Sequence, residues 1–467
     1  MMDLKKLLND RRVREIMNSG PSTRGARDSR TEFQRDYGRI LYSTPVRRLS
    51  DKAQVFPLEP NDSVRTRLTH SLEVSSVARD LAAQAARWLP GVRDHEMSDI
   101  ASIASTCGLV HDLGNPPFGH AGELAIQTWF QQQPESFFAP LGGRESQFAQ
   151  DFLRFEGNAQ TLRLLTKLQV LADDLSLNLT AGTLSAALKY TAPSTFPHTA
   201  ESPHECSKPG YFASEAEIVE MIRRETGTGE ARNPIAFLVE AADDIVYSTV
   251  DLEDSVKKGV LTWDQIHEHV RAAAIGASKE QRAICDNALE RAAREIHREL
   301  RGKAKEQALA QAFRTAAIGE MVPSAVETFD AQHKLILNGD YHKELLEDEA
   351  CSAQTLVKAC KSLLRGFTYC DEGILRLEIM GRTVIHDLMD LLWQAAPGFR
   401  PDPDPQTYEG KTYLLISENY RRVFEESLQQ DSGRPPEVYR KLQLITDHVC
   451  GMTDTYACSL HRRLMNA

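Results

Sequence analysis

The sequence lacks the features that mark secreted, membrane-spanning and zinc-ribbon proteins. Its eight cysteines are scattered and include no Cys-x-x-Cys pair, a usage that favours reduced thiols over a disulfide framework or a structural zinc site. No apolar run approaches the roughly 18 residues that a membrane-spanning helix needs. The N-terminus, Met-Met-Asp-Leu-Lys-Lys, has charges where a signal peptide needs an apolar core. We therefore expect a cytoplasmic protein with no membrane partner.

Strand-like alternation is almost absent, and so are internal repeats and heptad arrays. Apolar residues instead recur at helical spacing along most of the 467 residues. A chain of this length accommodates two or three domains, or one large helical domain with appended parts. The predicted fold is mostly α, with helices over residues 65–88, 98–113, 233–258, 279–320, 355–364, 374–393 and 438–465.

Acidic residues outnumber basic ones, 66 Asp and Glu against 55 Lys and Arg. The net charge of −11 argues against a generally basic nucleic-acid-binding surface. The segment up to Arg67 is an exception, with 15 Lys and Arg against 9 Asp and Glu. Two interpretations of this segment are open: an ordinary solvated surface, or arginines that converge on phosphate groups.

Four residues carry the chemistry that the sequence does offer: His70, the pair His111-Asp112, and Asp243. Each of them alone is commonplace. The His-Asp pair, however, ends a predicted helix and runs into the Gly/Pro-rich loop 114–120, which contains a third histidine, His120. Two imidazoles and two carboxylates without cysteine suit a catalytic divalent metal that keeps positions open for water and substrate. Mg, Mn, Fe, Co and Zn are all admissible for such a set.

Several sequence segments resemble, in order, those of the deoxyguanosinetriphosphate triphosphohydrolases, a branch of the HD-domain metal-dependent phosphohydrolases. The resemblance is close over residues 28–254 and weaker in the C-terminal third, where Gly451-Met-Thr-Asp-Thr-Tyr456 matches best. The segments that carry it are Phe33-Gln-Arg-Asp-Tyr-Gly-Arg-Ile40, Ser43-Thr-Pro-Val-Arg-Arg-Leu49, Gln54-Val-Phe-Pro-Leu58, Arg65-Thr-Arg-Leu-Thr-His-Ser-Leu-Glu-Val74, residues 108–123, Phe155-Glu-Gly-Asn-Ala-Gln160, Lys189-Tyr190, Lys208-Pro-Gly-Tyr-Phe212 and Glu240-Ala-Ala-Asp-Asp-Ile-Val-Tyr247.

The resemblance implies a helical HD-domain core and hydrolysis of a deoxynucleoside triphosphate, dGTP above all, to a deoxynucleoside and inorganic triphosphate. It places the divalent metal, Mg or Mn first, on His70, His111, Asp112 and Asp243. Asp243 is preferred to Asp244 because Tyr247 follows it by four residues, as in the family. The general acid/base role falls on His120, with Glu123 orienting it. The implied substrate-binding residues are Gln54, Val55, Arg67, Asn158, Lys189, Tyr190, Lys208, Tyr247 and Asp251.

Helical spacing supports part of this assignment. Arg67 lies one turn before His70, His120 and Glu123 lie three residues apart, and Tyr247 lies four residues before Asp251. Plainer interpretations stay open for some of these residues. Glu123 could be a simple helix contact, the two lysines ordinary surface residues, and Tyr247 a core aromatic.

The expected organisation is a basic N-terminal segment (1–60) that contributes to the nucleotide site, an HD-domain core (61–260) and a helical C-terminal region (261–467). The resemblance also implies a homo-oligomer and a nucleotide or single-stranded DNA effector. Two alternative functions remain: another HD-type nucleotide phosphohydrolase, or a catalytically silent protein that binds nucleotides or single-stranded nucleic acid. The loop 191–212 could serve as a lid or as a plain connection.

Overall fold

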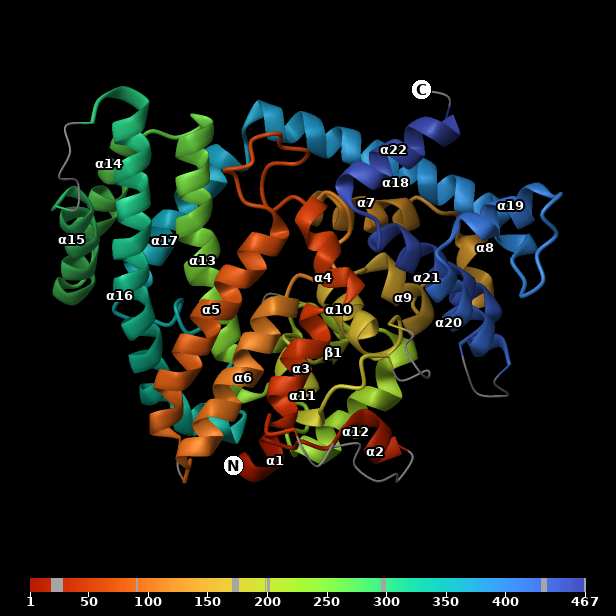
Figure 1. Ribbon diagram of the computed structural model, residues 1–467, viewed down its shortest axis with the longest axis horizontal. Helices are drawn as coiled ribbons and strands as arrows, with labels where there is room; N and C mark the ends of the chain where they lie inside the picture. Colours follow the sequence, from red (N-terminus) through yellow and green to blue (C-terminus); the bar gives the residue numbers. More distant parts are fainter. Residues whose placement is uncertain are drawn as a thin grey trace.

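Helices provide nearly all of the regular structure in the computed structural model of the chain (Figure 1). The structure describes residues 1–17, 28–89, 91–169, 176–197, 199, 202–294, 300–429 and 435–465. Within them, the strands are two short segments, β1 (Ala192–Pro193) and β2 (Pro209–Tyr211), which pair in parallel. The mostly α prediction is confirmed.

Three helices form the frame that holds the histidines and aspartates: α5 (Arg67–Ala85), α6 (Asp94–Val110) and α13 (Pro234–Lys258). The three helices pack against one another. The side chain of Asn233 caps α13 by accepting the N–H of Ile235 at 3.0 Å, and Pro234 occupies the first turn. Gly259, with a φ of 77°, ends the helix. The capping signals in the sequence therefore set both ends of α13.

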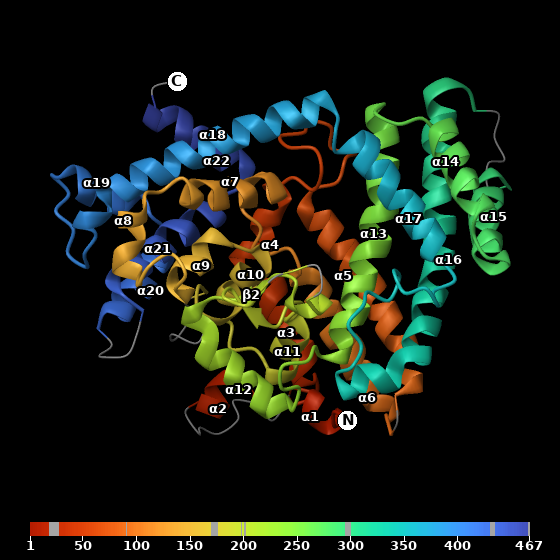
Figure 2. The ribbon, with the colours of Figure 1, turned by 180° about the vertical axis from the view of Figure 1, so that it is seen from behind.

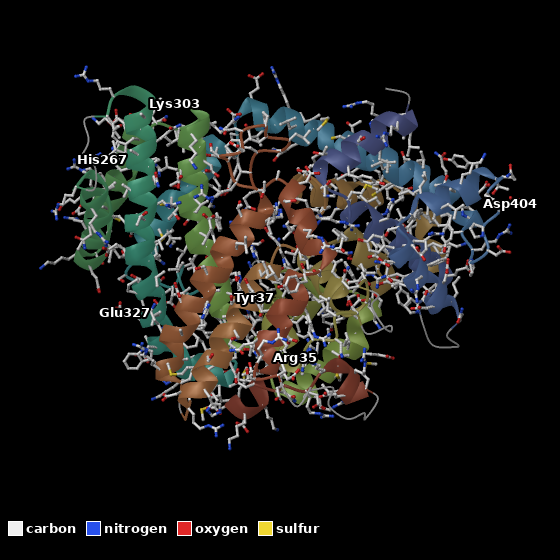
Figure 3. All side chains as sticks on the ribbon, viewed as in Figure 1. Arg35, Tyr37, His267, Lys303, Glu327 and Asp404 are labelled. Carbon is white, nitrogen blue, oxygen red and sulfur yellow. The ribbon has the colours of Figure 1, made fainter. Side chains whose placement is uncertain are left out.

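A second group of helices covers one side of this frame: α14 (Trp263–Ile275), α15 (Lys279–Arg294), α16 (Gly302–Asn338) and α17 (Gln354–Leu363). Helices α16 and α17 both pack on α13 (Figure 2). The single helix predicted over 279–320 is wrong. The segment forms two helices that pack against each other, and Gly302, with a φ of 56°, begins the second one. Charged side chains such as Lys303 and Glu327 on α16 lie at the periphery (Figure 3).

The opposite side is formed around α18 (Glu372–Ala395), which packs against α7 (Gly119–Gln131), α21 (Glu437–Cys450) and α22 (Asp454–Met465). The remaining α-helices are α1 (Leu4–Leu7), α2 (Val13–Met17), α3 (Glu32–Leu41), α4 (Thr44–Arg48), α8 (Glu135–Phe138), α9 (Gln147–Leu153), α10 (Gly157–Thr166), α11 (Ala181–Ala187), α12 (Ala216–Thr226), α19 (Tyr408–Leu415) and α20 (Glu418–Leu428).

The helices enclose two large hydrophobic cores, and the chain crosses from one to the other beside the His-Asp pair. Val74, Leu238 and Phe313 belong to the first core, and Phe130 and Leu388 to the second. At the end of α6, Cys107 belongs to the first core and Leu109 to the second. The His111-Asp112 turn that follows α6 is therefore anchored in both cores. None of the helices in the described ranges is long and apolar enough to cross a membrane.

Candidate active site

A cavity of about 660 Å³ opens beside the turn that follows α6. The residues that line it range from Ala53 to Glu378 on α18. The cavity brings together every sequence-predicted site residue except His70 and Glu123: Gln54, Val55, Arg67, His111, Asp112, His120, Asn158, Lys189, Tyr190, Lys208, Asp243, Tyr247 and Asp251. His70 lies fully buried behind Asp243, and Glu123 lies buried behind His120.

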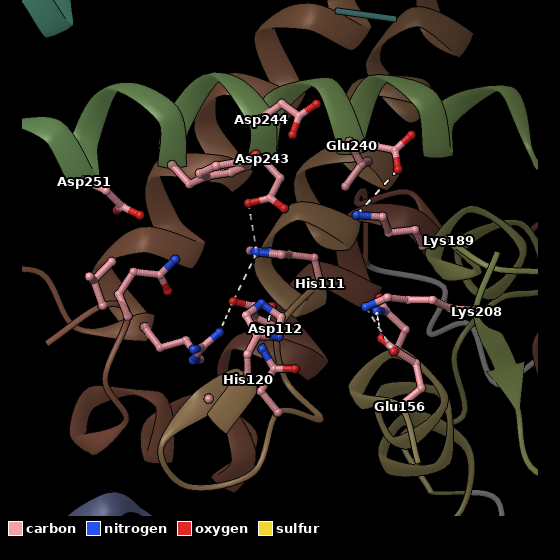
Figure 4. A pocket seen from close by; sticks show the side chains of 18 of the residues that line it. His111, Asp112, His120, Glu156, Lys189, Lys208, Glu240, Asp243, Asp244 and Asp251 are labelled. Atoms are coloured by element: carbon pink, nitrogen blue, oxygen red, sulfur yellow. Dashed lines mark hydrogen bonds and ion pairs between the residues drawn. The ribbon is translucent and has the colours of Figure 1, made fainter. Parts of the chain in front are cut away.

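Three of the four predicted metal ligands, His111, Asp112 and Asp243, lie together at the cavity (Figure 4). His70 lies behind Asp243, and its ligand atom is within 4.8 Å of those of His111 and Asp112. Asp243 Oδ1 lies 3.1 Å from His70 Nε2 and 3.5 Å from His111 Nε2. His111 Nε2 lies 3.5 Å from Asp112 Oδ2. Ligand atoms about 2.1 Å from one small cation are separated by about 3 Å, so these spacings match the edges of a coordination shell.

The hydrogen bonds of His111 supply an independent test of that fit. Its Nδ1 lies 2.7 Å from the carbonyl oxygen of Gly108 at the end of α6, which sets this nitrogen as the donor. The other nitrogen, Nε2, is buried and has no hydrogen-bond partner in the described part of the chain. An imidazole fixed by a carbonyl on one side, with a free lone pair on the other, is the arrangement of a metal-ligating histidine. The residues present therefore fit a divalent cation, although nitrogen and oxygen donors alone do not select one metal.

Both ligand carboxyls are held in the ionised form that metal binding requires. Burial opposes ionisation of Asp112, but the charges of Arg67 and His111 bring its pKa below the usual range. Burial likewise opposes ionisation of Asp243, and the neighbouring His111 and His70 lower its pKa to about 2. The Arg67 guanidinium contacts Asp112 directly, and Asn115 donates to Asp112 Oδ1 at 2.8 Å.

His120 stands at the mouth of the same cavity, at the start of α7. Its side chain is 82% exposed, and its Nδ1 lies 3.8 Å from the buried Oε2 of Glu123. The neighbouring Glu123 carboxylate raises the pKa of His120. The i,i+3 spacing thus places a carboxylate behind the imidazole and leaves the imidazole free to meet a reacting group.

Two lysines on the other side of the cavity are held by carboxylates. Lys189 Nζ lies 3.5 Å from Glu240 on α13, and Lys208 Nζ lies 3.2 Å from Glu156 (Figure 4). Burial opposes the charge of Lys189, but Tyr190 and Glu240 raise its pKa well above the ordinary value. Arg67, Lys361 and Arg365 also line the cavity, so these lysines are two of its five Lys and Arg side chains.

Gln54 and the polar stripe of α13 form the third wall. Gln54 Oε1 is buried and has no hydrogen-bond partner among the residues described. Asp251, which is 2% exposed, accepts a hydrogen bond from the hydroxyl of Tyr369 at 3.3 Å. Asp244 pairs with Lys361 at 3.1 Å, whereas Asp243 contacts the histidines. The two adjacent aspartates therefore have different partners.

Several cavity residues have no counterpart in the sequence-based prediction. Glu156, Glu240 and Asp244 lie in the segments that carry the family resemblance. Their burial marks them as cavity residues, and this burial is visible only in the structure. Lys361, Arg365, Tyr369 and Glu378 come from α17, α18 and the turn between them. Their stretch of sequence has no motif that points to a nucleotide or a metal.

These features define a class of protein, a helical HD-domain phosphohydrolase with a candidate metal centre. An HD-domain family model matches residues 67–153, which contain α5, α6 and the His-Asp turn. The deoxyguanosinetriphosphate triphosphohydrolase-like protein of Listeria monocytogenes is 36% identical over 483 aligned residues that cover 99% of each chain. The deoxyguanosinetriphosphate triphosphohydrolase of Yersinia enterocolitica is 33% identical over 93% of this chain and 94% of its own. The chain belongs to the deoxyguanosinetriphosphate triphosphohydrolase family.

Proposed function

We propose that the protein hydrolyses deoxynucleoside triphosphates, dGTP first among them, to a deoxynucleoside and inorganic triphosphate. One observation carries the proposal. A single cavity joins three of the four proposed metal ligands, with His70 directly behind them, to the exposed His120, to the cations Arg67, Lys189 and Lys208, and to the unpaired amide oxygen of Gln54. A nucleoside triphosphate needs these groups together: cations for its phosphates, a proton for its leaving oxygen and hydrogen-bonding groups for its sugar.

Binding of the triphosphate is assigned to the proposed metal ligands and to the cationic side chains beside them. His70, His111, Asp112 and Asp243 would hold the divalent cation, which when bound supplies a water of lowered pKa and Lewis-acid polarisation of the phosphoryl group. Arg67, Lys189 and Lys208 bind the triphosphate oxygens and offset their charge. The same side chains orient the α-phosphate for attack in line with the 5′ oxygen.

Protonation of the leaving group is assigned to His120. The 5′ oxygen of a nucleoside is a poor leaving group, so protonation as its bond to phosphorus breaks lowers the barrier. His120 carries this proton, and Glu123 favours the protonated imidazole by raising its pKa. The products are a neutral deoxynucleoside and inorganic triphosphate, with the attacking water supplying the new phosphate oxygen.

The sugar is assigned to Gln54, Val55, Asp251 and Tyr247, with Asn158 and Tyr190 beside it. The unpaired oxygen of Gln54 and the carboxyl of Asp251 are suited to accept the 3′-hydroxyl hydrogen. A Tyr247 ring packed under C2′ leaves no room for a ribose hydroxyl. Steric exclusion of this kind favours deoxynucleotides.

Product analysis tests the proposal directly. The purified protein is incubated with Mg²⁺ or Mn²⁺ and each dNTP in turn, with GTP as the ribose control, and the products are separated by anion exchange. Deoxynucleoside and intact triphosphate are expected, with dGTP turned over fastest and GTP left uncleaved. Release of pyrophosphate and a nucleoside monophosphate would retain an HD-type hydrolase and reject this reaction.

Two histidine variants complete the test. His111→Ala removes a proposed ligand, and we expect it to abolish metal binding, measured by calorimetry, together with turnover. His267→Ala changes a histidine on α14, far from the cavity (Figure 3), and should leave both unchanged. Full activity in His111→Ala would remove His111 from the proposed metal centre.

A further inference from the structure

Asp454, the first residue of α22, joins two segments of the candidate active site without lining the cavity. It is 2% exposed. Its Oδ1 accepts the backbone N–H of Phe118 at 2.9 Å, and its Oδ2 accepts the backbone N–H of Ala53 at 2.9 Å. Each carboxylate oxygen thus holds a segment more than 300 positions away in the sequence.

Lys52 joins the same segments from the opposite direction. It is 4% exposed, and its Nζ donates to the carbonyl of Asn115 at 2.5 Å and to the carbonyl of Cys450 at 2.7 Å. Two buried charged side chains therefore tie together residues 51–54, 115–118 and 450–454. We refer to Lys52, Asp454 and their four backbone partners as the clamp.

Each of the two segments held by the clamp positions groups of the cavity. Ala53 directly precedes Gln54, and its carbonyl oxygen accepts the Arg67 Nε–H at 3.1 Å. Asn115 donates to Asp112. Displacement of either backbone segment would therefore move the sugar-binding side, the metal-binding side or both.

The segment before His120 needs such support because its backbone is strained. Phe118 has a φ of 64° and Gly119 a φ of 59°. For a bulky residue such as Phe118, the left-handed region is costly and persists only where the surroundings impose it. The hydrogen bond from the Phe118 N–H to Asp454 is such a constraint. It acts two residues before the imidazole assigned to proton transfer.

We propose that Asp454, acting with Lys52, is a positioning residue that holds the Gln54 segment and the His120 turn in register. The inference rests on the proposed function for its catalytic consequence, but the clamp itself is a structural claim. Asp454 never touches the substrate. It is coupled to turnover through the position of His120 relative to the bound nucleotide.

Asp454→Asn is a nearly isosteric substitution that tests the clamp. A carboxylate offers an acceptor to both backbone N–H groups, whereas an amide offers one oxygen and turns its own NH₂ toward the other donor. Asp454→Asn therefore loses one of the two hydrogen bonds and leaves a buried N–H without a partner. The matched control is Thr455→Val. Thr455 is the next residue, and its hydroxyl donates at 2.7 Å to Oδ1 of Asp51 at the surface.

Two measurements are made on the full-length wild type, Asp454→Asn and Thr455→Val. Steady-state kinetics with metal and dNTP give kcat and KM, and hydrogen exchange read by mass spectrometry gives the local opening of peptides over 51–56 and 115–121. We expect Asp454→Asn to lower kcat by about 10-fold to 100-fold, with a smaller rise in KM. Exchange should accelerate in those two peptides and remain unchanged in α16. Thr455→Val loses only the exposed contact with Asp51, so it should keep the wild-type kcat and the wild-type exchange of the 115–121 peptide.

Wild-type exchange at both peptides in Asp454→Asn, or acceleration spread evenly over the chain, would overturn the proposal. Retained kcat together with accelerated local exchange would overturn its catalytic part. If the wild type turns over no dNTP, the proposed function fails, and the exchange comparison still decides whether the clamp exists. Should Asp454→Asn not fold, Lys52→Gln tests the same claim, because it weakens the opposite tie and should loosen the same two peptides.

Discussion

His120 and Glu123 form an i,i+3 ion pair in which the two side chains have different roles. The imidazole is exposed to the cavity, and the carboxylate is buried behind it. Burial opposes ionisation of Glu123, but the neighbouring His120 lowers the pKa of the carboxyl. The same contact raises the pKa of the imidazole. At neutral pH the pair therefore favours a protonated histidine facing the substrate, which is the form that a general acid requires.

Removal of the Glu123 charge should move the pH dependence of turnover. In Glu123→Gln the contribution that raises the pKa of His120 is lost, so the imidazole deprotonates at lower pH. Because the protonated form is the active one in the proposed reaction, we expect the alkaline limb of the kcat/KM profile to shift to lower pH. Turnover at neutral pH should fall by about 10-fold or more. The measurement is the rate of triphosphate release across the pH range.

A surface pair provides the control for this variant. Glu220 forms the same kind of i,i+3 ion pair with Arg223, at 2.6 Å, and its side chain is 67% exposed. Glu220→Gln should leave the pH profile where it was. An alkaline limb that stays in place in Glu123→Gln would show that Glu123 does not set the pKa of His120.

At the scale of helices, the sequence predicts what is locally encoded. Asn233-Pro234 and the apolar spacing predict α13, whereas the helix predicted to run to residue 113 ends at Val110 and leaves the His-Asp pair in the turn that follows. The single helix predicted over 438–465 is wrong, because the segment forms α21 and α22. The presence of Lys361 and Tyr369 in the cavity was not predictable. Their contacts with Asp244 and Asp251 on α13 join positions more than 100 residues apart, and no local pattern encodes such a pairing.

Helix α18 supports the His120 turn through a glycine. A Cβ built on Gly381 would lie 2.6 Å from Cγ and 2.7 Å from Cδ2 of the Phe118 ring. Gly381→Ala should therefore displace the ring and the turn that precedes His120. We expect destabilisation of about 1–3 kcal/mol from overpacking, partly offset by the better helix propensity of alanine, and a several-fold loss of kcat. Thermal unfolding and steady-state kinetics measure the two effects.

The control for this substitution is Gly276→Ala. An added Cβ at Gly276 meets no atom within 4 Å, and the residue follows α14, away from the cavity. This variant should retain wild-type kcat. Wild-type stability and kcat in Gly381→Ala would mean that the Phe118 ring adjusts without moving the turn.

At the scale of the whole molecule, the candidate site depends on two cores that meet around it. His70 and Asp243 stand on helices of the first core, whereas Phe118 and the helices α7, α18 and α21 contribute to the second. Asp454 and Lys52 link the C-terminal end of α21 and the start of α22 to the turn between the cores. Loss of packing in the second core is therefore expected to affect turnover even where the metal ligands are intact.

His448 offers a way to weaken the second core with pH alone. It lies on α21 and is 5% exposed. Burial, followed by the charge of Arg48, lowers its pKa from 6.5 to about 4. Between these two values the unfolded chain binds a proton that the folded protein does not. The contribution of His448 to the free energy of unfolding is therefore fully present above the unfolded pKa of 6.5 and is lost as the pH falls toward the folded pKa of about 4.

His448→Gln should remove this pH dependence, because glutamine is neutral in both states. Denaturant unfolding at pH 7 and at pH 5 should show the wild type losing about 2 kcal/mol more than the variant over that interval. The variant is expected to be somewhat less stable at pH 7, because glutamine packs less well in a buried site, so the comparison uses the difference between the two pH values. Equal losses in both proteins would show that His448 is not held neutral by the second core. A smaller loss in the wild type would contradict the sign of its pKa shift.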